Sequence, residues 1–261
     1  MDLRLSGRTA LVTGASKGIG LAIVRALAGE GVRVVAGART TTPELAALAA
    51  EGLVHPVNAD LGTAEGAATL VERAAAELGR LDILVNNVGG VRPRVGGFLS
   101  VTDQDWLDSL TINLLAAVRV TRAALPLLLE RGGNIVTINS VNSSLPDPLV
   151  IDYSASKAAL ANFSKSLSKE VGPRGIRVNT ISPGPVETDL WLGAGGVAET
   201  VGAAGGSSPE DVAKGAVGGT ATGRFTRPDE VADLVLLLAG DRAGNVTGAD
   251  IVIDGGLIST L

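Results

Sequence analysis

The sequence has no cysteine, one histidine (His55) and few aromatic side chains, namely two tryptophans, three phenylalanines and a single tyrosine, Tyr153. The lack of cysteine excludes a disulfide scaffold, a cysteine nucleophile, a thiolate-bound zinc ion and an iron–sulfur cluster. A serine–histidine triad or a multi-histidine metal site would depend on His55 alone, and we expect no metal site. Acid–base chemistry near neutral pH is therefore left to His55, to a carboxylate or lysine with a shifted pKa, or to Tyr153.

Charge and hydropathy limit the partners of the protein. The formal net charge is -5 and the pI about 5.0, and no lysine or arginine run forms a basic stripe, so we expect no nucleic-acid binding. Apolar runs such as residues 234–239 fall far short of the ~18 residues that span a membrane. A strand-like run begins within the first ten residues and leaves no room for a signal peptide. We expect a cytoplasmic protein with no membrane partner.

Short β-branched runs alternate along the chain with longer stretches rich in alanine and leucine. This alternation predicts βαβ units, and hence a Rossmann-type, doubly wound α/β fold with a seven-stranded parallel sheet and helices on both faces. The length would loosely permit two domains, but no linker or repeat divides the chain, and we expect one domain over residues 1–261. The expected strands cover residues 9–13, 33–38, 53–57, 83–85, 134–139, 177–181 and 250–253. The expected helices cover residues 18–28, 43–50, 63–78, 102–131 with a possible break near Pro126, 153–171 and 228–238.

Residues 183–226 interrupt this rhythm, because ten of the 35 glycines fall between positions 193 and 223 and the periodicity weakens. Long loops in compact domains are usually functional or disordered. We therefore expect residues 185–226 to form a mobile substrate-binding lid, with Trp191 as an apolar wall of a roomy pocket. A tolerated surface insertion is the alternative.

A glycine-rich segment, TGASKGIG at residues 13–20, lies between the first expected strand and the first expected helix. Glycines let a backbone approach a pyrophosphate, while the N–H groups and dipole of the following helix face its charge. The spacing differs by one residue from the G-x-G-x-x-G pattern, and a simple strand–helix turn is the alternative reading. The candidate phosphate-binding residues are Gly14, Ser16, Lys17, Gly18, Ile19 and Gly20.

The end of the second strand indicates which dinucleotide is bound, because an acidic side chain there bonds the ribose 2′-hydroxyl of NAD. This chain has no acid at that point and has Arg39 instead. Arg39 and Lys17 could neutralise a 2′-phosphate, which favours NADP(H) over NAD(H), although both could be solvated surface cations. Asp60, after the third strand, could reach the adenine or cap the next helix.

Tyr153 and Lys157 lie four residues apart, on one face of an expected helix. A cation within ~4–6 Å favours phenolate, so the ammonium can lower the phenol pKa and make Tyr153 a proton donor and acceptor. The pair alone is a weak motif. An interfacial tyrosine beside a solvated lysine is the structural alternative.

Together these elements resemble the short-chain dehydrogenase/reductase family in their order and spacing over nearly the whole chain. The one departure is Val88, where the family usually has alanine. The matching segments are residues 13–20, Asp60-Leu61, Asn86-Asn87-Val88-Gly89, Asn113, Ser140, Tyr153 with Lys157, Pro183-Gly184 and Asp254-Gly255-Gly256.

The resemblance implies a role for each matching position. Tyr153 is the acid–base residue, and Lys157 lowers its pKa and holds the nicotinamide ribose. Ser140 orients the reacting carbonyl, and Asn113 holds a water that links Lys157 to solvent. Each has a plainer alternative: Ser140 could simply end a strand, Asn113 could satisfy buried backbone, and Thr188 could cap a short helix. Further cofactor contacts are implied for Leu61, Asn87, Val88, Gly89, Pro183, Gly184, Val186 and Thr188.

The expected function is therefore an NADP(H)-dependent oxidoreductase that interconverts a carbonyl and an alcohol by hydride transfer. A non-catalytic dinucleotide-binding regulator or scaffold with the same fold is the alternative. The expected partner is a small-molecule substrate, and Arg92 and Arg94 could bind an anionic one. The resemblance also implies a homotetramer, or a homodimer, formed through the expected helices 102–131 and 153–171 and the last strand, with the apolar end 257–261 buried.

Overall fold

Seven β-branched runs form one parallel sheet in the computed structural model, which describes residues 2–260. Its strand order is β3-β2-β1-β4-β5-β6-β7, and the chain crosses from one edge to the sheet centre between β3 and β4. Met1 and Leu261, which end the expected domain and the expected apolar C-terminal segment, lie outside the described residues. The strands are β1 Thr9–Thr13, β2 Arg33–Ala38, β3 Val54–Asn58, β4 Ile83–Asn86, β5 Gly133–Ile138, β6 Ile176–Pro183 and β7 Asp250–Ile253.

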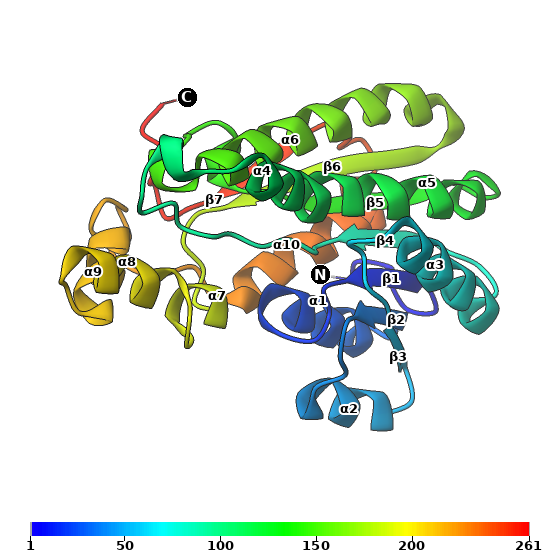
Figure 1. Cartoon of the computed structure of the whole chain (residues 1–261). Helices are drawn as coiled ribbons and strands as arrows, with labels where there is room; N and C mark the ends of the chain where they lie inside the picture. Colours follow the sequence, from blue (N-terminus) through cyan, green and yellow to red (C-terminus); the bar gives the residue numbers. More distant parts are fainter. Residues whose placement is uncertain (1, 261) are drawn as a thin grey trace.

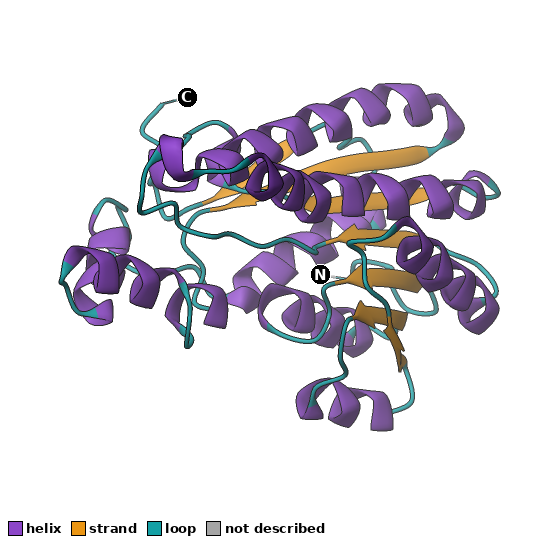
Figure 2. Cartoon of the chain, viewed as in Figure 1, coloured by secondary structure: helices purple, strands orange, loops and turns teal. Residues whose placement is uncertain are grey.

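Helices cover both faces of the sheet (Figures 1 and 2). Alternate strand residues point to opposite sides, so Ala10 and Val12 of β1 enter one core while Leu11 enters the other. The first core contains residues of α1 Gly18–Gly29, α2 Pro43–Ala50 and α10 Pro228–Ala239. The second contains residues of α3 Ala64–Leu78, α5 Ala116–Leu129 and α6 Ile151–Val171. The doubly wound parallel sheet is confirmed, and the expected strands and these helices agree with the structure to within two residues at each end.

The expected helix 102–131 is interrupted, but not at Pro126. α4, Asp103–Leu110, passes through one π-helical turn, Thr111–Leu115, into α5, and Pro126 lies inside α5 without ending it. The predicted site of the break is therefore wrong, and the wider π turn lies at Asn113 instead. Within residues 2–260, Asp103–Leu129 is the one helical stretch long and apolar enough to cross a membrane; in this structure it packs on α3, α6 and the sheet.

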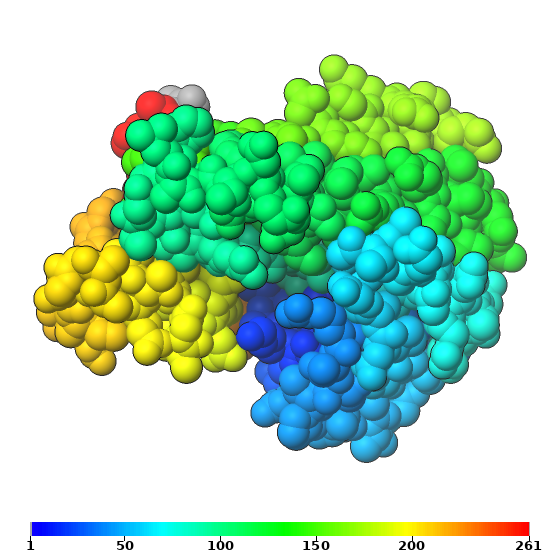
Figure 3. Space-filling model, in the orientation of Figure 1, coloured from blue at the N-terminus to red at the C-terminus, as the bar shows by residue number. Residues whose placement is uncertain are grey.

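The glycine-rich segment 185–226 contains three short helices where the sequence predicted none, and its expected mobility stays a prediction. It contains α7 Asp189–Leu192, α8 Val197–Gly205 and α9 Pro209–Gly218. The glycines cluster at helix ends, where Gly206 with φ +68° terminates α8. Backbone hydrogen bonds of 2.9 Å from Thr226 N to Pro185 O and from Glu187 N to Thr226 O join the two ends of the segment. The segment therefore leaves and rejoins the fold at one point, and it forms a lobe beside the main body (Figure 3).

Candidate active site

A cleft of about 1310 Å³ lies between segment 185–226, the expected lid, and the body of the protein. Its floor is formed where β1, β4, β5 and β6 end, so it includes the point at which the strand order reverses. Ligands of open α/β sheets bind at this switch point, outside the carboxyl ends of the strands. Every predicted site residue lines this cleft except Asn113, which is buried behind it.

The glycine-rich loop is shaped to bring backbone close to a ligand. Gly14 and Gly18 have φ of +65° and +54°, a region that side-chain-bearing residues rarely adopt. A Cβ on Gly20 would lie 2.1 Å from Gly14 O, so only glycine allows this close approach. Lys17 is the N-cap of α1, with no side-chain capping bond, and the first turn of the helix opens on the cleft. Free N–H groups at a helix N-terminus suit a phosphate.

Two residues brace this loop against β4. Thr13 Oγ1 accepts hydrogen bonds from Asn87 N at 2.9 Å and Val88 N at 3.1 Å. Asn87 Nδ2 donates to Thr13 O at 3.0 Å and to Gly14 O at 3.1 Å. The Asn87 side chain thus holds the loop in place. The bracing role of the Thr13 hydroxyl was not predicted, since its two donors are distant in sequence.

The far end of the cleft carries the charges expected to select the dinucleotide. Arg39 follows β2, is exposed and lines the cleft together with Lys17, and neither forms an ion pair within the described chain. Asp60 Oδ1 accepts from Gly62 N at 3.0 Å, whereas Thr63 caps α3 by accepting from Gly66 N. The alternative in which Asp60 caps that helix is therefore wrong.

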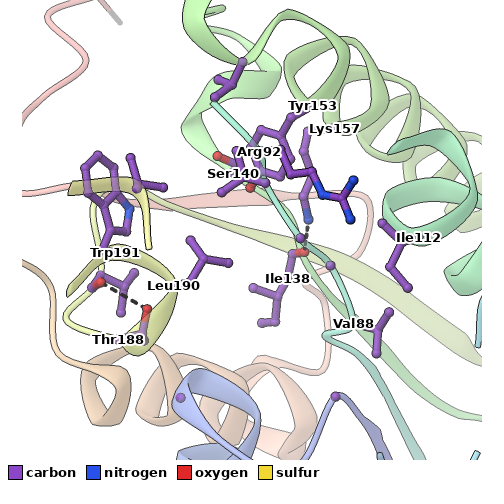
Figure 4. A pocket seen from close by; sticks show the side chains of 18 of the residues that line it. Val88, Arg92, Ile112, Ile138, Ser140, Tyr153, Lys157, Thr188, Leu190 and Trp191 are labelled. Atoms are coloured by element: carbon purple, nitrogen blue, oxygen red, sulfur yellow. Dashed lines mark hydrogen bonds between the residues drawn. The ribbon is translucent and has the colours of Figure 1, made fainter. Parts of the chain in front are cut away.

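Tyr153 and Lys157 project from the first turns of α6 toward the end of β5 (Figure 4). Lys157 is buried, its Nζ donates to Ile138 O at 2.9 Å, and Nζ lies 5.6 Å from the Tyr153 ring centroid. Burial lowers the pKa of Lys157 to about 8. Burial raises the pKa of Tyr153, and the Ser140 hydroxyl offsets part of this rise. The described hydrogen bond of the ammonium is to a carbonyl rather than to the phenol, so the lowering of the phenol pKa by Lys157 stays a prediction.

Ser140 lies two residues beyond β5 and caps a 3-10 turn, Val141–Ser143. Its Oγ donates to Asn142 Oδ1 and accepts from Asn142 N, both at 3.2 Å. Asn142 Nδ2 in turn donates to Leu145 O at 3.2 Å. Asn142 therefore sets the direction of the Ser140 hydroxyl. Sequence reasoning missed this residue, although it lies only two positions from Ser140.

Asn113 occupies the π turn, with its side chain facing the loop after β4. Its Oδ1 accepts from Gly90 N at 3.0 Å, and its Nδ2 donates to Gly90 O at 2.9 Å and Ser109 O at 3.1 Å. A Cβ on Gly89 would lie 2.9 Å from Asn113 Oδ1 and 3.5 Å from Lys157 Nζ, so Gly89 lies between the two side chains. The described contacts of Asn113 are thus to backbone, and its role toward Lys157 stays a prediction.

Arg94 borders the cleft, but its guanidinium is already paired with two carboxylates, which argues against its assignment as a candidate anion-binding residue. Its Nη1 lies 2.8 Å from Asp105 Oδ1, and its Nη2 lies 2.5 Å from Asp152 Oδ2. The hydrogen bond with Asp152 is the main cause of the raised pKa of Arg94. This buried ion pair ties the loop after β4 to α4 and α6. Arg92, by contrast, is exposed and lines the cleft, with no ion pair within residues 2–260.

The segment after β6 forms the remaining wall. Four residues for which the family resemblance implies cofactor contacts line the cleft here, namely Pro183, Gly184, Val186 and Thr188. Thr188 Cγ2 would lie 3.2 Å from a Cβ on Gly18, so the start of the lid segment touches the glycine-rich loop. Thr188 precedes α7 but makes no side-chain capping bond. His55 lies outside this cleft, with its Nδ1 3.0 Å from Glu77 Oε1.

Comparison with known proteins agrees with this geometry. A family model described as Enoyl-(Acyl carrier protein) reductase matches residues 14–258. The chain belongs to the short-chain dehydrogenase/reductase family. It is 35% identical over 262 residues to the 3-oxoacyl-(acyl-carrier-protein) reductase of Thermotoga maritima, covering 98% of this chain and 100% of the relative. It is 39% identical over 270 residues to D-threitol dehydrogenase of Mycolicibacterium smegmatis, covering 98% of this chain and 94% of the relative.

The fold of this short-chain dehydrogenase/reductase is also that of solved relatives. The L-sorbose reductase of Gluconobacter frateurii, solved in complex with NADPH and L-sorbose, superimposes with a TM-score of 0.91 at 33% identity, with 100% of both chains covered. The protein is therefore an oxidoreductase of carbonyl and alcohol groups with a Rossmann-type NAD(P)-binding fold. The names of these relatives give different carbonyl or alcohol substrates, so family membership leaves the substrate open.

Proposed function

We propose that this enzyme reduces a carbonyl to an alcohol, or the reverse, with NADP(H) and with Tyr153 as general acid and base. The observation that carries the proposal is the convergence of the glycine-rich loop, Ser140, Tyr153 and Lys157 on one cleft at the carboxyl ends of the strands. When bound, the nicotinamide supplies or accepts the hydride. The protein contributes orientation and the movement of one proton.

The proton step follows from the positions of three side chains. Tyr153 donates its phenolic proton to the carbonyl oxygen, and Ser140 donates a hydrogen bond to the same oxygen after redirecting its hydroxyl from Asn142. Lys157 is protonated below pH about 8 and places a cation 5.6 Å from the phenol ring. That charge stabilises phenolate as the proton leaves. Asn113, through its bonds to Gly90, holds the loop that covers Lys157.

NADP(H) is favoured over NAD(H) by charge at the far end of the cleft. Arg39 and Lys17 are cations that line this end without an ion-pair partner in the described chain, and no carboxylate ends β2. A guanidinium can donate two parallel hydrogen bonds to the oxygens of a 2′-phosphate, whereas a 2′-hydroxyl offers one oxygen and no charge. The NADPH bound to the sorbose reductase relative supports the same choice.

The direct test is NADPH oxidation with a panel of ketones and aldehydes. Tyr153→Phe should lose turnover while NADPH binding, followed by fluorescence, is kept. Arg39→Ala should raise the KM for NADPH without raising that for NADH. Arg25→Ala, an exposed arginine of α1 outside the cleft, is the control and should change neither. Full turnover by Tyr153→Phe would refute the role of Tyr153 as general acid and base. Absence of NADPH oxidation with every carbonyl would favour the alternative of a non-catalytic dinucleotide-binding regulator or scaffold.

Assembly and location are part of the same proposal. The edge strand β7 exposes Val252, and the family resemblance implies that a second copy covers this strand and the helices α5 and α6. We therefore infer a cytoplasmic homotetramer or homodimer with a small-molecule substrate. Light scattering after gel filtration gives the mass, and a monomer would contradict the assembly.

A further inference from the structure

The lid turns an apolar surface toward the catalytic residues. On α8, Val197 and Val201 line the cleft, and on α9, Val212 and Ala216 do the same. Each pair is four residues apart, so each helix presents one stripe of its surface to the cleft. The charged residues of these helices, Glu199, Glu210, Asp211 and Lys214, do not line it.

Three other segments complete this apolar wall. Leu190 and Trp191 of α7 face the cleft opposite Ser140 and Tyr153 (Figure 4), and Leu145 and Leu149 border it from the loop before α6. Leu145, Leu149 and Leu190 are 43%, 39% and 41% exposed, so large apolar area is left open to solvent beside the catalytic residues. Trp191 is held in place by an edge-to-face contact with Phe225, with ring centroids 5.8 Å apart.

The polar side chains of this region are few, and most are already bonded within the protein. Asn142 bonds Ser140 and Leu145, and Asp147 Oδ1 accepts from Leu149 N at 2.9 Å. Arg92 and Asp189 also line the cleft, and neither forms an ion pair within residues 2–260. The Arg92 guanidinium points toward Ile112, on the other side of the cleft from Trp191 (Figure 4). A sugar or polyol would require several convergent donors and acceptors, because each buried hydroxyl without a partner costs free energy.

We propose that the substrate is a carbonyl compound with a bulky apolar substituent, an alkyl or alicyclic group of several carbons, which lies against α7, α8 and α9. This inference rests on the proposed function, since Ser140 and Tyr153 mark where the carbonyl is placed. D-Threitol and L-sorbose, which appear in the names of two relatives, should then be poor substrates of this protein. Covering the exposed leucines and the valine stripes removes apolar area from water on both sides of the contact.

A homologous series of methyl ketones from 2-butanone to 2-octanone tests the proposal at saturating NADPH. The kcat/KM should rise at least about twofold and up to about fourfold with each added methylene, as expected for burial of CH₂ groups. L-Sorbose and erythrulose should be far poorer than 2-octanone. A flat series, or a ketose that is the better substrate, would overturn the apolar assignment but leave carbonyl reduction intact. Absence of turnover with every carbonyl would instead count against the proposed function.

An isosteric pair of variants locates the effect on the lid. Val212→Thr places a hydroxyl in the apolar wall and should lower kcat/KM for 2-octanone at least about threefold, while leaving 2-butanone and the KM for NADPH unchanged. Val217→Thr, on the same helix but outside the cleft, is the matched control and should leave the whole series unchanged. Equal effects of Val212→Thr on both ketones, or of Val217→Thr on 2-octanone, would refute the assignment of α9 as the wall for the apolar group.

Discussion

Replacing Lys157 with methionine should make the protein more stable at pH 7 while removing its activity. Lys157 is only 3% exposed, and within residues 2–260 its ammonium bonds one neutral carbonyl, that of Ile138, and no carboxylate. Burial lowers its pKa from 10.5 to about 8, and at about 1.4 kcal/mol per pKa unit the buried charge costs about 3 kcal/mol. Methionine has a similar shape and no charge. After subtracting about 1 kcal/mol for the lost hydrogen bond, we expect a net gain of about 2 kcal/mol.

The pH dependence of this difference has a definite sign. Below pH about 8 the lysine is charged in both the folded and the unfolded state, so the full penalty applies. Between pH 8 and 10.5 the folded protein has released its proton while the unfolded chain still holds one, and the wild-type stability rises with pH relative to the variant. The advantage of Lys157→Met should therefore shrink toward zero as pH approaches 10.5.

Urea unfolding followed by circular dichroism, at pH 7 and pH 10 and one protein concentration, measures both effects. Lys169→Met is the control: Lys169 is exposed on the same helix, and its removal should change the free energy of unfolding by less than about 0.5 kcal/mol. The reasoning fails if Lys157→Met is less stable than the wild type at pH 7. It also fails if the gap between the two proteins is the same at both pH values.

Three further predictions concern stability and ionisation. Thr13→Val leaves two backbone N–H groups without their acceptor and should lower the free energy of unfolding by at least about 2 kcal/mol. Thr13→Ser keeps the acceptor and should lower it by at most about 1 kcal/mol. Similar losses in both variants would contradict this prediction. Because Tyr153 is the only tyrosine of the sequence, a titration followed by phenolate absorbance reports the pKa of Tyr153 alone. The midpoint should lie above the usual value of about 10, and the absorbance change should be absent in Tyr153→Phe. A midpoint below 10 would show that burial does not dominate the pKa of Tyr153. Arg94→Met leaves Asp152 buried without its partner and should lower the free energy of unfolding, measured with urea, by about 3 kcal/mol. The double variant Arg94→Met/Asp152→Asn should recover part of this loss. A double variant as unstable as Arg94→Met would mean that the ion pair is not responsible.

Much of the fold is local in origin, and the sequence determines it. Runs of β-branched residues such as 33–38 form strands in any context that buries them, and Thr102 with Asp105 forms a capping box from neighbouring residues alone. The loop at 13–20 is also predictable, because its glycines satisfy steric demands set within a few residues. The glycines of 193–223 misled for the opposite reason. Most of them lie at helix ends, as Gly206 does with a left-handed φ after α8, although Gly202 and Gly215 lie inside helices. Their number alone hides the short helices of this segment.

The same distinction between local sequence and tertiary structure applies to the candidate site. The sequence was enough to name Tyr153, Lys157 and the glycine-rich loop as candidates, and the family resemblance added Ser140. Only the tertiary structure decided that Lys157 donates to Ile138 O rather than to the phenol and that Arg94 is paired with Asp152. It also decided that valines of α8 and α9 line the cleft. These facts depend on which chain segments meet across the sheet and how deeply each charge is buried. A sequence specifies such contacts only through the whole fold, so the candidate residues and Trp191 could be named from the chain, but their bonding partners and the valines that line the cleft could not.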